Sequence, residues 1–313
     1  MQIGIVGAGS VGAATAFALM MRGVARKITL VDLDKTKAWA EAADIAHAAP
    51  FAYANKIKSG TYANLKECEI VIITAGANQK EGESRTDLLV QNVKIFAEII
   101  PQIVRYATDA ILLVATNPVD VMTYVTLKLS NFAKEKVIGS GTLLDTARFR
   151  TDLGYHLGVS PKSIHAHVLG EHGDSEVLCW DSGDAGSIPL AQLAFDLGRP
   201  YDDKIKAQID DDVRNAAYKI IAGKKATYFG IAGALTRICQ AISTNEYAIL
   251  TVSSQHSIIE GVEDVCISLP CVVGKRGIHQ VLKPHLSKQE HLLLQLSAAK
   301  IKKLSQEAEK LFD

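Results

Sequence analysis

The chain has 313 residues, of which 48% are hydrophobic and 22% are charged, and 34 Lys and Arg balance 34 Asp and Glu. Zero formal net charge argues against a nucleic-acid partner or an anionic membrane surface, and no apolar run reaches the roughly 18 residues of a membrane span. The length suffices for two domains with full hydrophobic cores.

The five cysteines are scattered along the chain, and none belongs to a C-x-x-C pair. An odd number without disulfide or metal spacing predicts buried thiols in a reducing cytoplasm. A strand-like run occupies residues 2–6, so we expect no secretory signal at this end.

The first 32 residues predict a strand, a glycine-rich turn, a helix and a second strand. Residues 2–6 are the first strand, residues 7–12 have the pattern G-x-G-x-x-G, and residues 13–21 are rich in Ala, Leu and Met. The second strand, at residues 28–31, ends at Asp32. An acid about 20 residues after the last glycine of such a turn is typical of dinucleotide binding.

Each residue type in this turn has a physical reason. Gly7 permits the tight turn, Gly9 lets the backbone approach a pyrophosphate, and Gly12 lets the helix pack closely on the strand. Asp32 can accept hydrogen bonds from the adenine ribose and would repel a 2′-phosphate, so NAD is favoured over NADP. The alternative is a glycine-rich turn in some other doubly wound protein.

Helices and strands continue to alternate through the first half. A helix is predicted over residues 35–49, and apolar strands are predicted at residues 69–74, 110–116 and 136–140. Near-continuous apolar strands are typical of a parallel sheet that is buried on both faces, so we predict a Rossmann-type doubly wound α/β fold. Ligands of such sheets bind beyond the carboxyl ends of the strands, where the chain has Gly76, Asn117 and Ser140.

Residues 78–85 are polar, contain one glycine and precede a long predicted helix near residues 87–107. The segment fits either a solvated surface loop or a lid, since it leaves the cofactor edge of the sheet.

The second half supplies a candidate acid/base group. His172 lies among glycines and acids directly after the predicted strand at residues 163–169, which suits proton transfer. Asp145 and Arg148 are three residues apart at the start of a predicted helix and could be only a surface ion pair. Asp145 could orient the histidine, Arg148 could bind a substrate carboxylate, and His172 could act as the acid/base group. Together with a dinucleotide-binding fold, these three functions are typical of hydride transfer to a 2-keto acid.

At this point the sequence resembles the NAD-dependent lactate/malate dehydrogenase family over essentially its whole length, and most closely the bacterial L-lactate dehydrogenases. The motifs that carry the resemblance are Gly7–Gly12 with Asp32, residues 77–85, Thr116–Asp120, Gly139–Arg148, Gly170–Asp174 and Ala226–Gly230.

The resemblance implies an enzyme and a role for each residue. His172 would exchange a proton with the C2 oxygen of the substrate, and Asp145 would orient its ring. Arg148 would bind the substrate carboxylate through two parallel hydrogen bonds, while Arg85 would polarise the carbonyl from the lid. Asn117 and Thr227 would line the substrate site. The other positions that match contacts to NAD are Val11, Asp32, Lys37, Tyr62, Gly76, Ala77, Ala115, Asn117 and Ser140.

Substrate choice depends on Gln79. The malate-specific members of the family carry arginine at this position, whereas a neutral glutamine leaves a second substrate carboxylate unpaired in a site that excludes water. Pyruvate and lactate are therefore favoured. Many relatives have proline where this chain has Glu81, so we expect a lid that is more flexible before closure.

Two further basic residues match an allosteric site. Arg150 and His165 occupy positions that bind fructose 1,6-bisphosphate across a subunit interface in many bacterial relatives. They could equally be unrelated surface residues. His165 and His167 are expected on one face of a strand, but no recognisable zinc spacing accompanies them, so we expect no metal.

We expect an NAD-binding Rossmann domain over residues 1–140 and an α+β substrate domain over residues 141–313. By resemblance alone the protein is expected to be a homotetramer with L-lactate dehydrogenase activity. The alternatives are a malate dehydrogenase and a non-catalytic NAD-binding sensor. Further helices are predicted at residues 189–193, 201–223 and 231–242 and after the capping box at residues 287–290, with strands at residues 248–253 and 265–269.

Overall fold

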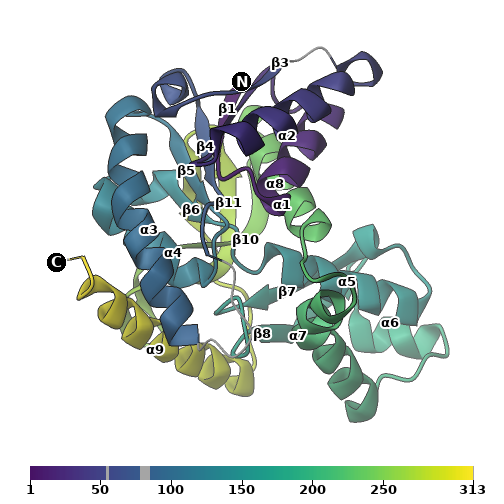
Figure 1. The fold of residues 1–313 in the computed structure, drawn as a ribbon. Helices are drawn as coiled ribbons and strands as arrows, with labels where there is room; N and C mark the ends of the chain where they lie inside the picture. The colour runs from purple at the N-terminus through teal and green to yellow at the C-terminus, as the bar shows by residue number, and fades with distance from the viewer. Residues whose placement is uncertain (54–55, 78–84, 313) are drawn as a thin grey trace.

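The computed structural model describes residues 1–53, 56–77 and 85–312 (Figure 1). Its main sheet has nine strands in the order β12-β11-β10-β6-β5-β4-β1-β2-β3. All neighbours from β3 to β6 are parallel, and β10 to β12 continue the sheet in antiparallel fashion beyond β6. The strands are β1 (Gln2–Val6), β2 (Lys27–Val31), β3 (Lys56–Ser59), β4 (Ile70–Ile73), β5 (Ile111–Val114), β6 (Val137–Gly139), β10 (Ala248–Ile259), β11 (Val262–Gly274) and β12 (Gly277–Val281).

Helices cover both faces of this sheet (Figure 1). Alternate residues of β4 belong to two separate apolar clusters: Val71 and Ile73 pack with α3, α4 and α9, whereas Ile70 and Ile72 pack with α1, α2 and α8. The continuous apolar strands of the sequence follow from this double burial. The helices are α1 (Ser10–Met21), α2 (Lys35–His47), α3 (Arg85–Tyr106), α4 (Val119–Ser130), α8 (Phe229–Ser243) and α9 (Lys288–Glu309).

A smaller unit packs beside the sheet (Figure 1). Its three-stranded antiparallel sheet, in the order β7-β8-β9, shares an apolar cluster with α5, α6 and α7. Gly170 and Ser268 exchange two backbone hydrogen bonds, so the turn after β7 is fixed to the main sheet. The elements are β7 (Ile164–Leu169), β8 (Val177–Ala185), β9 (Ile188–Pro189), α5 (Leu143–Leu157), α6 (Leu190–Asp196) and α7 (Asp203–Lys224).

The predicted Rossmann-type sheet is confirmed, and several element boundaries are corrected. The predicted helix over residues 35–49 ends at His47, because Pro50 lies in a separate 3-10 turn, Ala49–Phe51. The predicted strands at residues 248–253 and 265–269 are the first half of β10 and the centre of β11, which are longer because they pair with each other along a hairpin. Within the part of the chain that the structure describes, every helix is too short or too polar to span a lipid bilayer.

Candidate functional site

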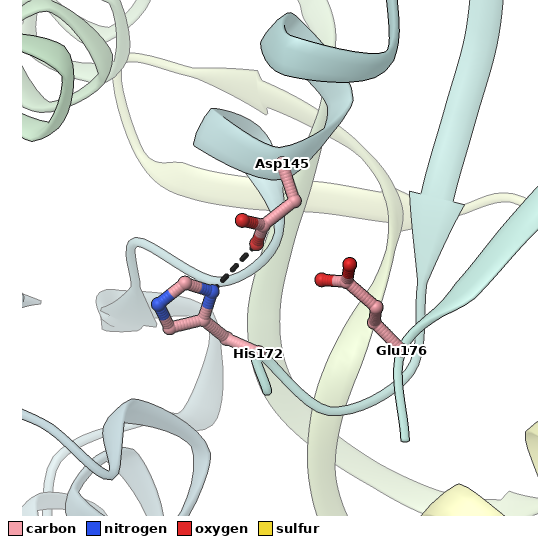
Figure 2. A group of neighbouring side chains, drawn as sticks. All are labelled: Asp145, His172 and Glu176. Atoms are coloured by element: carbon pink, nitrogen blue, oxygen red, sulfur yellow. Dashed lines mark hydrogen bonds and ion pairs between the residues drawn. The ribbon is translucent and has the colours of Figure 1, made fainter. Parts of the chain in front are cut away.

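Two distant segments place a histidine against a carboxylate. Asp145 lies in the first turn of α5 and is 2% exposed, and His172 lies in the turn between β7 and β8. His172 Nδ1 is 2.5 Å from Asp145 Oδ2, and the other ring nitrogen points away from the carboxylate (Figure 2). Asp145 Oδ1 accepts a 2.7 Å hydrogen bond from Arg148 Nη1. Asp145 therefore fixes the histidine ring and the arginine at once.

The backbone around His172 is tied to the carboxyl edge of the main sheet. The N–H group of His172 donates to Asp120 Oδ2 at 2.8 Å, and Asp120 lies in the first turn of α4, the helix that follows β5 in the chain. The Ser268 hydroxyl of β11 donates to the other Asp120 oxygen at 3.4 Å and accepts from the N–H group of Thr142 at 3.1 Å. These contacts bring His172 to the edge where ligands of a parallel sheet bind.

The Asp145–His172 pair is an ion pair at neutral pH. Burial raises the pKa of Asp145, but His172 and Arg148 outweigh it, and the pKa lies below the usual value. Burial likewise lowers the pKa of His172, but the Asp145 carboxylate, with smaller contributions from Asp120 and Glu176, raises it to about 9. At neutral pH the imidazole is therefore protonated, and it can donate a proton to a bound oxygen atom.

A third ionisable group faces this pair. Ligand atoms of Asp145, His172 and Glu176 all lie within 4.8 Å of one another (Figure 2). Burial, and then the Asp145 charge, raise the pKa of Glu176 to about 8. The donor types would suit a cation, but both Asp145 oxygens already accept hydrogen bonds, from Arg148 and His172.

The glycine-rich turn is shaped for a phosphate. Gly7 has φ +109°, in the left-handed region, and a Cβ at Gly12 would lie 1.9 Å from the Gly7 carbonyl oxygen. A Cβ at Gly9 would meet no atom within 4 Å, so the backbone there is open to a close ligand. Asp32, at the end of β2, accepts from the N–H groups of Ala8 at 2.6 Å and Asp34 at 3.0 Å. The residues present therefore fit a dinucleotide.

The neighbouring strand ends are joined by a buried amide. Asn92 of α3, which is 1% exposed, accepts from the N–H group of Ala77 and donates to the Asn117 carbonyl, both at 2.8 Å. A Cβ at Gly76 would lie 2.5 Å from the Thr116 side chain. Asn92 thus holds the ends of β4 and β5 in fixed relation.

Comparisons with known proteins agree with this geometry. Residues 1–139 match the family description "lactate/malate dehydrogenase, NAD binding domain", and residues 142–312 match "lactate/malate dehydrogenase, alpha/beta C-terminal domain". The chain belongs to the lactate/malate dehydrogenase family. It is 49% identical over 302 residues to the L-lactate dehydrogenase of Thermus aquaticus, covering 96% of this chain and 97% of that one.

Other members of the lactate/malate dehydrogenase family are similar over nearly their whole length. The L-lactate dehydrogenase of Allorhizobium ampelinum is 48% identical over 97% of this chain and 98% of its own. The solved structure of a minor L-lactate dehydrogenase from Enterococcus mundtii, in a ligands-bound form, superposes with a TM-score of 0.94 at 37% identity and 97% coverage of both chains.

The structure brings most of the predicted site residues to one edge of the sheet. Gly7, Gly9, Val11, Gly12, Asp32, Gly76, Ala77, Ala115, Asn117 and Ser140 all lie at or just beyond the carboxyl ends of β1, β2, β4, β5 and β6. Tyr62 is partly buried, and burial, then the charges of Asp32 and Glu98, raise its pKa. Lys37 is exposed in the first turn of α2, and Thr227 is partly buried between α7 and α8.

The predicted lid falls mostly outside the described residues. Gln79 and Glu81 lie there, so their roles stay predictions. Arg85 is the first residue of α3, which begins two residues before the predicted start at Asp87. The expected role of Arg85 in polarising the carbonyl also stays a prediction.

The residues predicted for fructose 1,6-bisphosphate have unequal surroundings. Arg150 donates from Nε to the Ala166 carbonyl at 2.8 Å and lies 3.5 Å from His167 Nδ1. His165 is exposed on β7, whereas His167 is partly buried. Burial, then the charge of Arg150, lower the pKa of His167 to about 4. The register of β7 shifts between the two histidines, so their surroundings differ more than simple alternation predicts.

Sequence reasoning assigned no role to Asp120, Asn92 or Glu176. Asp120 and Asn92 are a charged and an amide residue within segments that otherwise read as buried helix, and this is a signal that the sequence did contain. Glu176 precedes the apolar strand β8 and gives no local signal, because its neighbours in the site come from α5 and α7.

Proposed function

We propose that this protein is an NAD-dependent L-lactate dehydrogenase, which catalyses the reversible reduction of pyruvate by NADH to (S)-lactate and NAD+. The 2.5 Å contact between His172 and Asp145 carries the proposal, because Arg148 shares the same carboxylate. An acid/base pair beside a fork for a carboxylate suits a 2-keto acid.

NADH supplies the hydride that reduces C2 of pyruvate. In the same step, His172 Nε2 gives its proton to the C2 oxygen, and Asp145 retains the negative charge that stabilised the imidazolium. Arg148 has N–H groups beyond the one that it gives to Asp145, and these bind the substrate carboxylate. Arg85 polarises the carbonyl oxygen as negative charge develops on it, and Asn117 and Thr227 line the substrate site.

The carboxyl edge of the sheet would hold the cofactor. Gly9, at the N-terminus of α1, would bind its pyrophosphate, because free N–H groups and the helix dipole there favour an anion. Asp32 retains lone pairs for the adenine ribose hydroxyls beyond its bonds to Ala8 and Asp34. A negative charge at this place disfavours a 2′-phosphate, so NAD is preferred to NADP.

Gln79 selects the monocarboxylic substrate. Malate and oxaloacetate would bring a second, unpaired carboxylate into the site. We expect Gln79→Arg to raise the ratio of kcat/KM for oxaloacetate to that for pyruvate. An unchanged ratio would remove Gln79 as the selecting residue.

A single spectrophotometric assay tests the proposed activity. NADH absorbance is followed after pyruvate or oxaloacetate is added to the purified protein. Faster loss of absorbance with pyruvate supports the proposal, and faster loss with oxaloacetate favours a malate dehydrogenase. No loss with either acid, together with retained NADH binding, would favour the sensor. The similar L-lactate dehydrogenases favour the first outcome.

Regulation and assembly are proposed on resemblance. Arg150 and His165 would bind fructose 1,6-bisphosphate between subunits of a homotetramer. Activity at low pyruvate is measured with and without the sugar bisphosphate, and an unchanged apparent KM refutes the activation.

The NAD-binding domain would span residues 1–140 and the substrate domain residues 141–313. The five free, buried cysteines support a cytoplasmic location.

A further inference from the structure

Glu176 is a buried carboxyl group that the proposed reaction does not use. It lies directly before β8, it is 4% exposed, and it faces Asp145 beside the histidine ring (Figure 2). Its Oε1 atom has no hydrogen-bond partner among the described residues. A buried carboxylate without hydrogen bonds is costly, so this environment favours the protonated form.

The groups around Glu176 come from three elements. Asp145 and Arg148 face it from α5, His172 from the turn before it, and Arg214 from α7. Arg214 is already bound to Asp210 through two N–H groups and to the Asp174 carbonyl at 3.0 Å. Around the ring of His172 itself, Asp145 and Asp120 are the other acidic groups. Glu176 is thus the one member of this set that has an unbonded buried oxygen beside a negative charge.

We propose that Glu176 is a positioning residue that adjusts the proton affinity of His172, as a neutral carboxyl group at neutral pH and as a carboxylate at alkaline pH. Loss of the Glu176 proton to solvent leaves a negative charge beside the imidazolium and stabilises it. The coupling is reciprocal, because the protonated ring makes that loss easier. Ligand atoms of the two groups lie within 4.8 Å of each other, so the charge on either one acts directly on the other.

The consequence for catalysis rests on the proposed function. At neutral pH an uncharged Glu176 does not repel the substrate carboxylate and does not compete for Arg148. At alkaline pH its charge keeps His172 protonated, so lactate oxidation, which needs the neutral ring, is delayed to higher pH. The proposal therefore predicts that Glu176→Gln lowers the pH at which His172 loses its proton.

The direct test follows the titration of His172 in the cofactor-free protein. Histidine is labelled with 13C at Cε1, and the His172 signal is assigned by its absence in His172→Gln. We expect the midpoint to fall by about half a pH unit or more in Glu176→Gln. Asp181→Asn, which removes one exposed charge from β8, is the matched control and should leave the midpoint in place. Equal midpoints in wild type and Glu176→Gln would overturn the proposal.

Two measurements extend the test. In Glu176→Gln, kcat/KM for lactate oxidation should rise at lower pH than in wild type, whereas a merely structural role would lower the rate at every pH. If the variant does not fold, infrared difference spectra of wild type between pH 7 and pH 10 should lose the band of a protonated carboxyl group. Absence of that loss would contradict the proposal. Failure of the proposed function would instead appear as no NADH oxidation with pyruvate, whatever the His172 titration shows.

Discussion

At the scale of single residues, the Asp145 carboxylate joins the acid/base group to the substrate anchor. After Arg148 donates one N–H group to Asp145, its planar guanidinium still has N–H groups that can bind both oxygens of a substrate carboxylate. A lysine ammonium group offers only a point charge. We predict that Arg148→Lys lowers kcat/KM for pyruvate by about 100-fold, mostly through a higher KM.

Steady-state kinetics check this prediction, with NADH affinity as the control, since Arg148 lies outside the glycine-rich turn. A kcat/KM within threefold of wild type would mean that Arg148 does not bind the substrate carboxylate.

Part of the site could be predicted because some of its residues lie close together in the sequence. Gly7, Gly12 and Asp32 lie within one local motif, so their spacing alone indicates the cofactor. His172 and Asp145 are 27 residues apart, so their residue types and the family resemblance suggested the pairing, but no local spacing indicated the 2.5 Å contact. Three residues of the site were missed: Asp120, Asn92 and Glu176. They act through tertiary contacts between segments, which no local spacing encodes.

At the scale of elements, the turn before α1 separates a packing glycine from a binding glycine. A methyl group at Gly12 collides with the Gly7 carbonyl, whereas one at Gly9 meets open space. We predict that Gly12→Ala lowers the Tm by about 5 °C or more, while Gly9→Ala leaves Tm nearly unchanged and weakens NADH binding by about tenfold or more.

Thermal unfolding and NADH fluorescence titrations measure the two effects separately. Normal NADH affinity in Gly9→Ala would mean that the pyrophosphate does not approach this residue.

Elements were predictable where their sequence signal was strong. The buried strands β4 and β5 are apolar throughout and β1 and β2 are mostly so, and all four were found close to their observed bounds. The edge strand β3 was missed, because its residues Lys56–Ser59 are half exposed and largely polar. Strands β10 to β12 join the parallel sheet through one paired position, between Ser253 of β10 and Gly139 of β6. No residue pattern in the sequence predicts this pairing.

At the scale of the whole molecule, the site affects how stability depends on pH. The folded-state pKa values of His172 and Glu176 are raised, to about 9 and about 8, so the folded protein binds protons more tightly than the unfolded chain. The contribution of His172 is fully present below its unfolded pKa of about 6.5 and is lost as pH rises through about 9. We predict that the Tm falls between pH 6.5 and pH 9.

Calorimetry across this range tests the prediction, and His172→Gln should flatten the slope because one of the two groups is gone. A Tm that rises with pH in the wild type would contradict the ionic state assigned to the site.

The central claim is that the Asp145–His172 pair delivers the proton during pyruvate reduction. The most direct test is kcat/KM for pyruvate as a function of pH, in wild type and in Asp145→Asn. We predict that the wild-type value falls as pH rises through about 9, because only protonated His172 can donate. In Asp145→Asn the fall should move to lower pH, and the rate should drop by about 10²–10⁴-fold. A fall at the same pH in both proteins, with a similar rate, would contradict the account.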